Sequence, residues 1–227
     1  MGSDDLFHRR KARAGAELQR QRRERARNKR VLIVCEGTKT EPHYLRELLD
    51  DLGIRPHVVC VAPNDGTSPK SVVSHALALY EKDDKAGDAF DQVYCVFDRD
   101  NHTTFNAAVQ RIQALNAAGK PFEAITSKPC FEVWLLLHFD YTDQPFHAAG
   151  KKSEGGQVVS ALKTKQGFDK YGKGQKGVYG QLKTKLANAL NNAERLRKQG
   201  LNTGSVNPAT DVDILVKAIQ ALARSSG

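Results

Sequence analysis

The segment VLIVC, residues 31–35, is a continuous apolar run rich in β-branched side chains, and it decides the fold prediction. Such a run is typical of a strand that is buried on both faces of a parallel sheet. The run stops at Glu36-Gly37, and residues 40–52 then place leucines at helical spacing until Gly53. We therefore expect this part of the chain to form a strand, a loop and a helix.

The same alternation continues along the chain. Further strand-like runs are HVVCVA at 57–62, QVYCVF at 92–97 and residues 122–126, and apolar residues recur at helical spacing over 71–80 and 105–115. Strands that alternate with helices are joined by right-handed crossovers and form a mostly parallel sheet. The sequence thus predicts an α/β fold with a mostly parallel sheet flanked by helices.

Composition divides the chain into four parts. Residues 1–30 form a basic arm, and residues 31–147 form the α/β core, which includes the very apolar stretch 130–139. That stretch predicts a buried helix, since it is too short to span a bilayer. Residues 148–180 are rich in Lys and Gly and are expected to be a mobile basic insertion, and residues 181–227 are expected to add helices that complete the core.

The overall composition excludes several classes of protein. The chain has 227 residues, of which 40% are hydrophobic, so it can bury a core and is not a disordered chain. No stretch is apolar for long enough to cross a membrane, and no secretory signal is present, so we expect a cytoplasmic protein with no membrane contact. The four cysteines are far apart and lack zinc-ligand spacing, which favours free thiols in a reducing compartment.

Positive charge is concentrated at one end of the sequence. Residues 1–30 hold 11 basic and 4 acidic residues, a net +7 of the chain's formal +9. Such an arm suits the phosphate backbone of a nucleic acid, because each neutralised phosphate releases counterions. A solubilising tail and a docking segment for a partner protein are the alternatives.

Acidic residues follow two of the predicted strands. Glu36 ends the first strand, with Glu41 shortly after it, and Asp98 and Asp100 follow the strand at 92–97. The carboxyl ends of parallel strands meet at one edge of a sheet, so these carboxylates should lie together and repel one another. Mg²⁺ or Mn²⁺ removes that repulsion, and two such ions can clamp the attacking and leaving oxygens of a phosphodiester.

The order and spacing of these motifs resemble a known family. Glu36-Gly37 after a first strand and Asp98-x-Asp100 after a later one resemble the Toprim fold of topoisomerases, primases and small nucleases. The segments VLIVCEGTKTEPHYLREL, VYCVFDRDNH and SKPCFEVWLLLHF look like the RloB family of prokaryotic anti-phage proteins, over roughly residues 25–222. The resemblance implies a nuclease-like effector of abortive infection, commonly encoded beside an ATPase.

The resemblance also implies roles for individual residues. Glu36 would transfer protons and bind metal, and Asp98 and Asp100 would be metal ligands. Glu41 and Glu132 would be additional ligands, although Glu132 also fits a buried helix acid with no such role.

Several basic residues near these motifs are open to two interpretations. Lys128 would stabilise negative charge on the reacting phosphate, or would be a surface lysine, and it stands where the family has Asn in a Ser-Asn-Pro motif. Arg99 would grip a phosphate or pair with a neighbouring Asp, and His102 would shuttle a proton or lie in solvent. Residues 151–176, with Tyr171 and Tyr179, would close over a nucleic acid or form a solvated loop.

Taken together, the sequence predicts a metal-dependent nuclease that acts on RNA, tRNA included, or on DNA. One alternative is a non-catalytic module that binds nucleic acid or an ATPase partner and contains a structural metal. Another is a phosphatase-like hydrolase with Asp98 as the nucleophile.

Overall fold

The computed structural model describes residues 29–64, 66, 68–99 and 103–225. The predicted basic arm therefore lies outside the described residues except for Lys29 and Arg30. The sheet has the strand order β2-β1-β3-β4-β5. Its strands are β1 (Val31–Cys35), β2 (Val59–Pro63), β3 (Gln92–Asp98), β4 (Phe122–Lys128) and β5 (Ala209–Thr210).

Strand pairing confirms the predicted fold class. β1 pairs in parallel with both β2 and β3, and β3 pairs in parallel with β4. The short strand β5, which the sequence did not indicate, pairs antiparallel with β4 at Ser127 and Lys128. The protein is thus α/β with a mostly parallel sheet.

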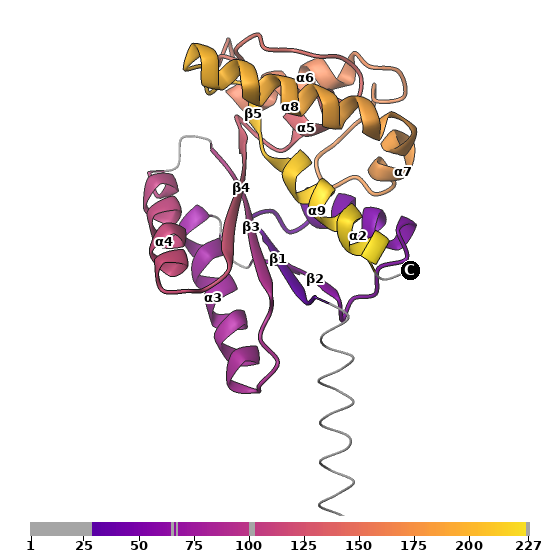
Figure 1. Ribbon diagram of the computed structural model, residues 1–227. Coiled ribbons are helices and arrows are strands. Elements are labelled where there is room, and N and C mark those ends of the chain that lie inside the picture. The colour runs from indigo at the N-terminus through magenta and orange to yellow at the C-terminus, as the bar shows by residue number, and fades with distance from the viewer. Residues whose placement is uncertain (1–28, 65, 67, 100–102, 226–227) are drawn as a thin grey trace, which may run out of the picture.

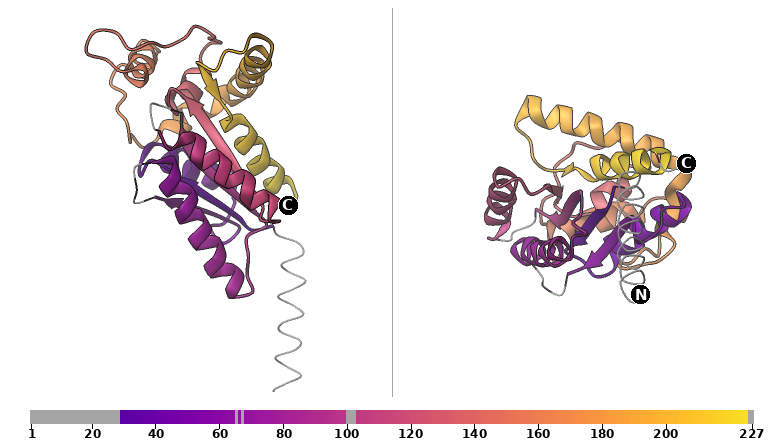
Figure 2. Two further views of the ribbon diagram at one scale, coloured as in Figure 1. Left: turned by 90° about the vertical axis from the view of Figure 1, so that its left-hand side faces the viewer. Right: turned by 60° about the horizontal axis from the view of Figure 1, so that its bottom comes forward.

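Helices cover both faces of this sheet (Figure 1; Figure 2). One face packs against α3 (Pro69–Lys85) and α4 (Phe105–Ala117). The other face packs against α2 (Thr40–Asp51) and α9 (Val212–Ser225). Because β1 is covered on both faces, each of its five residues is buried, as its unbroken apolar run predicts.

The remaining helices gather beyond the carboxyl end of β4 (Figure 1). They are α5 (Glu132–Leu136), α6 (Glu154–Lys163), α7 (Val178–Leu182), the 3₁₀ helix η1 (Lys183–Lys185) and α8 (Leu186–Thr203). Their apolar side chains join the same cluster as α2 and α9, so residues from 148–180 contribute to the main core. Among the helices that the structure describes, each is too short or too polar to cross a lipid bilayer.

Residues 130–138 of the apolar stretch are buried, as predicted, and Phe139 is partly buried, but only residues 132–136 are helical. Side chains bond carbonyls at its end: His138 Nδ1 lies 3.0 Å from the carbonyl oxygen of Trp134, and Asn192 donates to that of Leu137 at 2.9 Å. These contacts satisfy polar groups that a longer helix would pair through its backbone. The stretch therefore folds as one short helix followed by a turn.

The imidazole of His138 gives the fold a testable pH dependence. His138 is fully buried, and its Nε2 lies 3.2 Å from the hydroxyl of Tyr44. Burial lowers the pKa of His138 to about 4, below the usual value near 6.5, so the folded state binds this proton less well than the unfolded chain. Its contribution to stability is therefore present above pH 6.5 and is lost as the pH falls to about 4.

We expect this loss to amount to about 3 kcal/mol in the free energy of unfolding. Urea denaturation of wild type and His138→Gln between pH 6.5 and 4 measures it, because the difference between the two curves isolates His138 from the acidic groups. Wild type should lose more stability than the variant as the pH falls. Equal slopes for the two proteins would show that His138 is not kept neutral by burial.

Candidate active site

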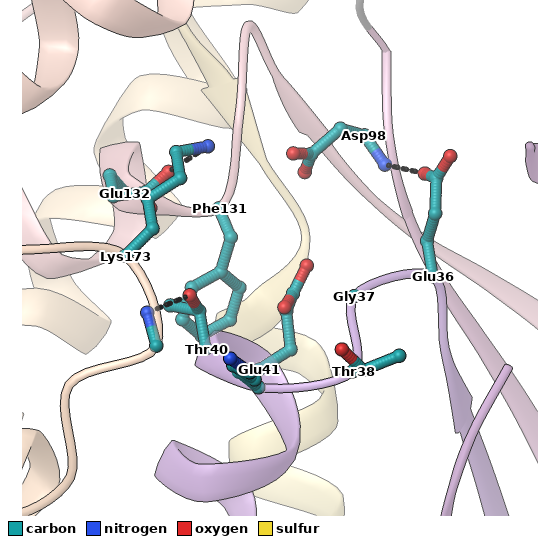
Figure 3. Close-up of a pocket in the computed structure, with 11 residues that line it drawn as sticks. Glu36, Gly37, Thr38, Thr40, Glu41, Asp98, Phe131, Glu132 and Lys173 are labelled. Carbon is teal, nitrogen blue, oxygen red and sulfur yellow. Dashed lines mark hydrogen bonds and ion pairs between the residues drawn. The ribbon is translucent and has the colours of Figure 1, made fainter. Parts of the chain in front are cut away.

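The acidic residues meet in a pocket at the carboxyl edge of the sheet (Figure 3). Its cavity has a volume of about 270 Å³. Carboxylates from separate segments line it, from the loop after β1, the first turn of α2, the end of β3 and the start of α5: Glu36, Glu41, Asp98 and Glu132. We call this cavity the acidic pocket.

Parallel pairing of β1 with β3 brings Glu36 and Asp98 together. Cys35 is opposite Val96, and the amide of Glu36 donates to the carbonyl of Val96 at 2.9 Å. The amide of Asp98 in turn donates to Oε2 of Glu36 at 3.2 Å. The Glu36 carboxylate is therefore held beside Asp98 by the strand register.

Gly37 allows Glu41 to approach the same edge. Glu41 is 8% exposed, and a Cβ atom on Gly37 would lie 2.2 Å from its Oε2. Any larger residue at position 37 would displace this carboxylate, so the Glu-Gly pair after β1 has a steric reason.

Burial and like charge make the acidic pocket costly for anions. Burial raises the pKa of Asp98 well above its ordinary value, and the charges of Glu41 and Glu132 raise it further. Burial also raises the pKa of Glu41, with a further contribution from Glu132. An arrangement of this kind favours the binding of a cation, because a cation offsets both the desolvation and the repulsion.

Glu132 is the most deeply buried carboxylate of the four, at 1% exposed. Its Oε1 accepts a hydrogen bond from the hydroxyl of Tyr171 at 3.2 Å, whereas its Oε2 has no hydrogen-bond partner. The ammonium of Lys173 lies 3.3 Å from that Oε2, close enough for an ion pair but without hydrogen-bond geometry. Burial acts to lower the pKa of Lys173. The attraction of Glu132 and of nearby acidic groups outweighs this effect, so the pKa of Lys173 is raised above its ordinary value and the ammonium stays charged.

Lys173 reaches the acidic pocket on residues 171–179, which we call the strap. The amide of Gly174 donates to Oγ1 of Thr40 at 2.8 Å. Further along, the amides of Gly177 and Tyr179 donate to the two carboxylate oxygens of Glu47, at 2.6 and 3.0 Å. The strap is thus fastened to α2 by charge-assisted hydrogen bonds.

Breaking this fastening should loosen the strap around Gly177 and Tyr179. We expect Glu47→Ala to lower the free energy of unfolding by about 2 kcal/mol, because two backbone amides lose a charged acceptor. Hydrogen exchange at the amides of Gly177 and Tyr179, followed by NMR, should accelerate. Asp50→Ala removes an exposed acid from the same helix and serves as the matched control, with little change expected in either measurement. Unchanged exchange in Glu47→Ala would contradict this description of the strap.

The structure corrects the interpretation of the two tyrosines. Tyr171 is 1% exposed and Tyr179 is 3% exposed, so neither presents a ring for stacking on a base. Both belong to the main apolar cluster. The contribution of this segment to the site is instead Lys173, one of several lysines that look alike in the sequence of residues 151–176. The flanking glycines, Gly172 and Gly174, were the available signal, because they permit a close backbone approach.

Three further candidates remain: Asp100, His102 and Lys128. Asp100 and His102 fall outside the described residues. Lys128, expected beside the acids, is not among the residues that line the acidic pocket. It lines a second cavity together with Arg99, because it alternates with Ser127 along β4 and belongs to the opposite face of the sheet.

The donor set of the acidic pocket suits Mg²⁺ or Mn²⁺, since it consists of carboxylate oxygens. The buried Oε2 of Glu132, which lacks a hydrogen bond, is an available donor. Within residues 29–99 and 103–225, leaving out positions 65 and 67, no three His, Cys, Asp or Glu side chains converge closely enough to enclose a metal ion. The pocket thus has suitable ligands lining one cavity rather than a closed coordination shell.

Fold and pocket together define an α/β protein with an acidic cavity at the carboxyl edge of a mostly parallel sheet. The chain belongs to the RloB-like protein family, whose model matches residues 31–219. This match confirms the family resemblance drawn from the three sequence segments. No curated protein matches the chain.

Proposed function

We propose that this protein is a metal-dependent nuclease of the Toprim type that hydrolyses phosphodiester bonds of nucleic acid in prokaryotic anti-phage defence. The observation that supports it most is the gathering of four carboxylates from separate segments in one cavity, with the buried Oε2 of Glu132 lacking a hydrogen bond. Membership of the RloB-like family is consistent with this proposal.

Glu36, Glu41, Asp98 and Glu132 would hold Mg²⁺ or Mn²⁺, with Asp100 as a further ligand from outside the described residues. The bound metal would polarise the phosphate and lower the pKa of a bound water. The protein supplies the rest of the chemistry. Its side chains orient the phosphate and move protons.

Glu36 is the candidate for proton transfer. Its carboxylate lines the cavity and is held by the amide of Asp98, which positions it for this role. Lys173 is the candidate for stabilising negative charge on the phosphate, because its ammonium lies 3.3 Å from a pocket carboxylate. Lys128 loses that role because it lines the other cavity.

Charge supports nucleic acid as the substrate. The net charge of +9 is concentrated in residues 1–30, which suits a polyanion. RNA, including tRNA, and DNA both satisfy this requirement. An ATPase encoded nearby is the expected partner, which makes its presence a variable of the assay.

The experiment is a cleavage assay on total tRNA, single-stranded RNA and plasmid DNA, with Mg²⁺, Mn²⁺ or EDTA. Wild type is compared with Asp98→Ala, each with and without the neighbouring ATPase. We expect metal-dependent cuts that are absent in EDTA and in the variant. Cuts that persist in EDTA would contradict a metal-dependent reaction.

A second candidate function is a non-catalytic module that binds nucleic acid or the ATPase partner. The ion pair between Lys173 and Glu132 favours it, because this contact already neutralises part of the buried charge. In that case nucleic acid is bound but never cut, under every condition of the assay.

A further inference from the structure

A second cavity, of about 190 Å³, lies where β4, β5 and α8 meet. Arg99 and Lys128 line it, and we call it the basic cavity. The amide of Arg99 donates to the carbonyl of Ser127 at 2.6 Å, so the backbones of Arg99 and Lys128 are neighbours at the ends of β3 and β4. Two cations are therefore placed side by side at the same sheet edge that carries the acidic pocket.

These two cations are available to a ligand. The guanidinium of Arg99 lies over the ring of Phe105 at 5.1 Å, and in the part of the chain that the structure describes neither Arg99 nor Lys128 forms an ion pair. Arg197, which also lines the cavity, differs because its nitrogens donate to the fully buried carboxylate of Asp213 at 2.6 and 2.7 Å.

One carboxylate, that of Asp211, also lines the basic cavity. Its Oδ2 accepts from the hydroxyl of Thr126 at 2.8 Å, and its Oδ1 lies 3.8 Å from Arg197. Both oxygens of Asp211 are thus engaged. Arg197 is shared between Asp211 and Asp213, so these three groups together carry a formal charge of −1. Arg99 and Lys128 add two positive charges, so the formal charge around the cavity is +1.

The remaining wall of the basic cavity combines hydroxyl side chains with an apolar part. Leu201 and Val206 line it, and they are the exposed large hydrophobic side chains in the described part of the chain, at 81% and 43%. A phosphate on the cations with a sugar or base against these aliphatic groups matches a nucleotide. Free inorganic phosphate would leave the apolar wall uncovered.

The basic cavity lies next to the acidic pocket along the chain. Asp98 and Arg99 are consecutive, and side chains alternate between faces at the end of a strand. Asp98 accordingly faces the acidic pocket, whereas Arg99 contacts Phe105 on the opposite side of the sheet. A nucleic-acid strand that crosses the ends of β3 and β4 would meet both cavities.

We propose that the basic cavity is a subsite for a nucleotide that flanks the phosphate in the acidic pocket, with Arg99 and Lys128 binding its phosphate. The subsite deepens the proposed function and rests on nucleic acid being the substrate. It assigns Arg99 and Lys128 to substrate binding, away from the reacting phosphate.

The test measures binding in EDTA, where no metal-dependent cleavage occurs. Fluorescence anisotropy follows a labelled single-stranded RNA, and a DNA of the same sequence, over a range of salt concentrations. For Lys128→Ala and Arg99→Ala we expect weaker binding. The slope of the logarithm of the association constant against the logarithm of the salt concentration should be shallower by about 0.7 for each lost phosphate contact. Lys85→Ala removes an exposed lysine at the far end of α3 and is the matched control, with an unchanged slope.

Slopes and affinities equal to wild type in both variants, with unchanged melting temperatures, would overturn the subsite. A wild type that binds neither oligonucleotide would overturn it as well. Failure of the nuclease proposal looks different, because no strand is then cut with any metal while Arg99→Ala and Lys128→Ala still weaken binding. The two proposals can therefore fail separately.

Discussion

Glu36→Gln should lower the rate of metal-dependent cleavage by about 10²–10⁴-fold, the usual contribution of a positioned general acid or base. The substitution preserves shape and can still accept the hydrogen bond from the amide of Asp98, so the fold and the backbone at the pocket should persist. What it removes is the charge and the ability to exchange a proton. Single-turnover cleavage at saturating Mg²⁺ measures the effect.

Glu123→Gln is the matched control for this prediction. Glu123 lies near the start of β4, at the opposite end of the sheet from the acidic pocket, and the same chemical change there should leave the cleavage rate near that of wild type. Equal rates for Glu36→Gln and wild type would remove Glu36 from the chemistry.

Asp98→Asn should make the protein more stable when metal is withheld. Burial and the charges of Glu41 and Glu132 raise the pKa of Asp98, so its ionised form is unfavourable in the fold. Removing that charge should increase the free energy of unfolding in EDTA by about 1–2 kcal/mol, the usual size of a stabilising change at a functional site. Thermal and urea denaturation in EDTA check this, and Asp169→Asn, at an exposed acid, is the control.

The pH dependence of this effect has a definite sign. Because the pKa of Asp98 is raised on folding, the folded state holds the proton more tightly than the unfolded chain. The contribution of Asp98 to stability therefore falls as the pH rises above the ordinary carboxyl range and through the raised pKa of Asp98. Asp98→Asn should lose this part of the pH dependence. If Asp98→Asn is less stable than wild type in EDTA at neutral pH, the charge of Asp98 does not destabilise the metal-free fold and this explanation is wrong.

The sequence predicted that Glu36 and Asp98 lie at the same edge of the sheet, because the carboxyl ends of parallel strands share one edge. The strand order that makes β1 and β3 adjacent, and with it the contact between the two residues, comes from the structure. Glu132 was reached through the family resemblance, and the structure places it in the same pocket.

Features that depend on distant packing were not predicted. Lys173 enters the pocket because the strap is fastened to Glu47 on α2, a contact between segments far apart in sequence that no local pattern encodes. Strand β5 has only two residues, too few to show alternation. Lys128 was predicted to lie beside the acids because it is close to Glu132 in sequence. That proximity does not reveal which face of β4 a side chain takes.

We propose that the carboxylates of the acidic pocket bind a divalent metal together. Titration of the protein with Mn²⁺, followed by electron paramagnetic resonance, tests this most directly. Wild type and Asp169→Asn should bind Mn²⁺ with the same affinity, whereas Asp98→Asn and Glu132→Gln should each bind it at least about tenfold more weakly, since one charged ligand is lost. Mn²⁺ binding that is equally strong in all four proteins, or absent from wild type, would contradict the claim.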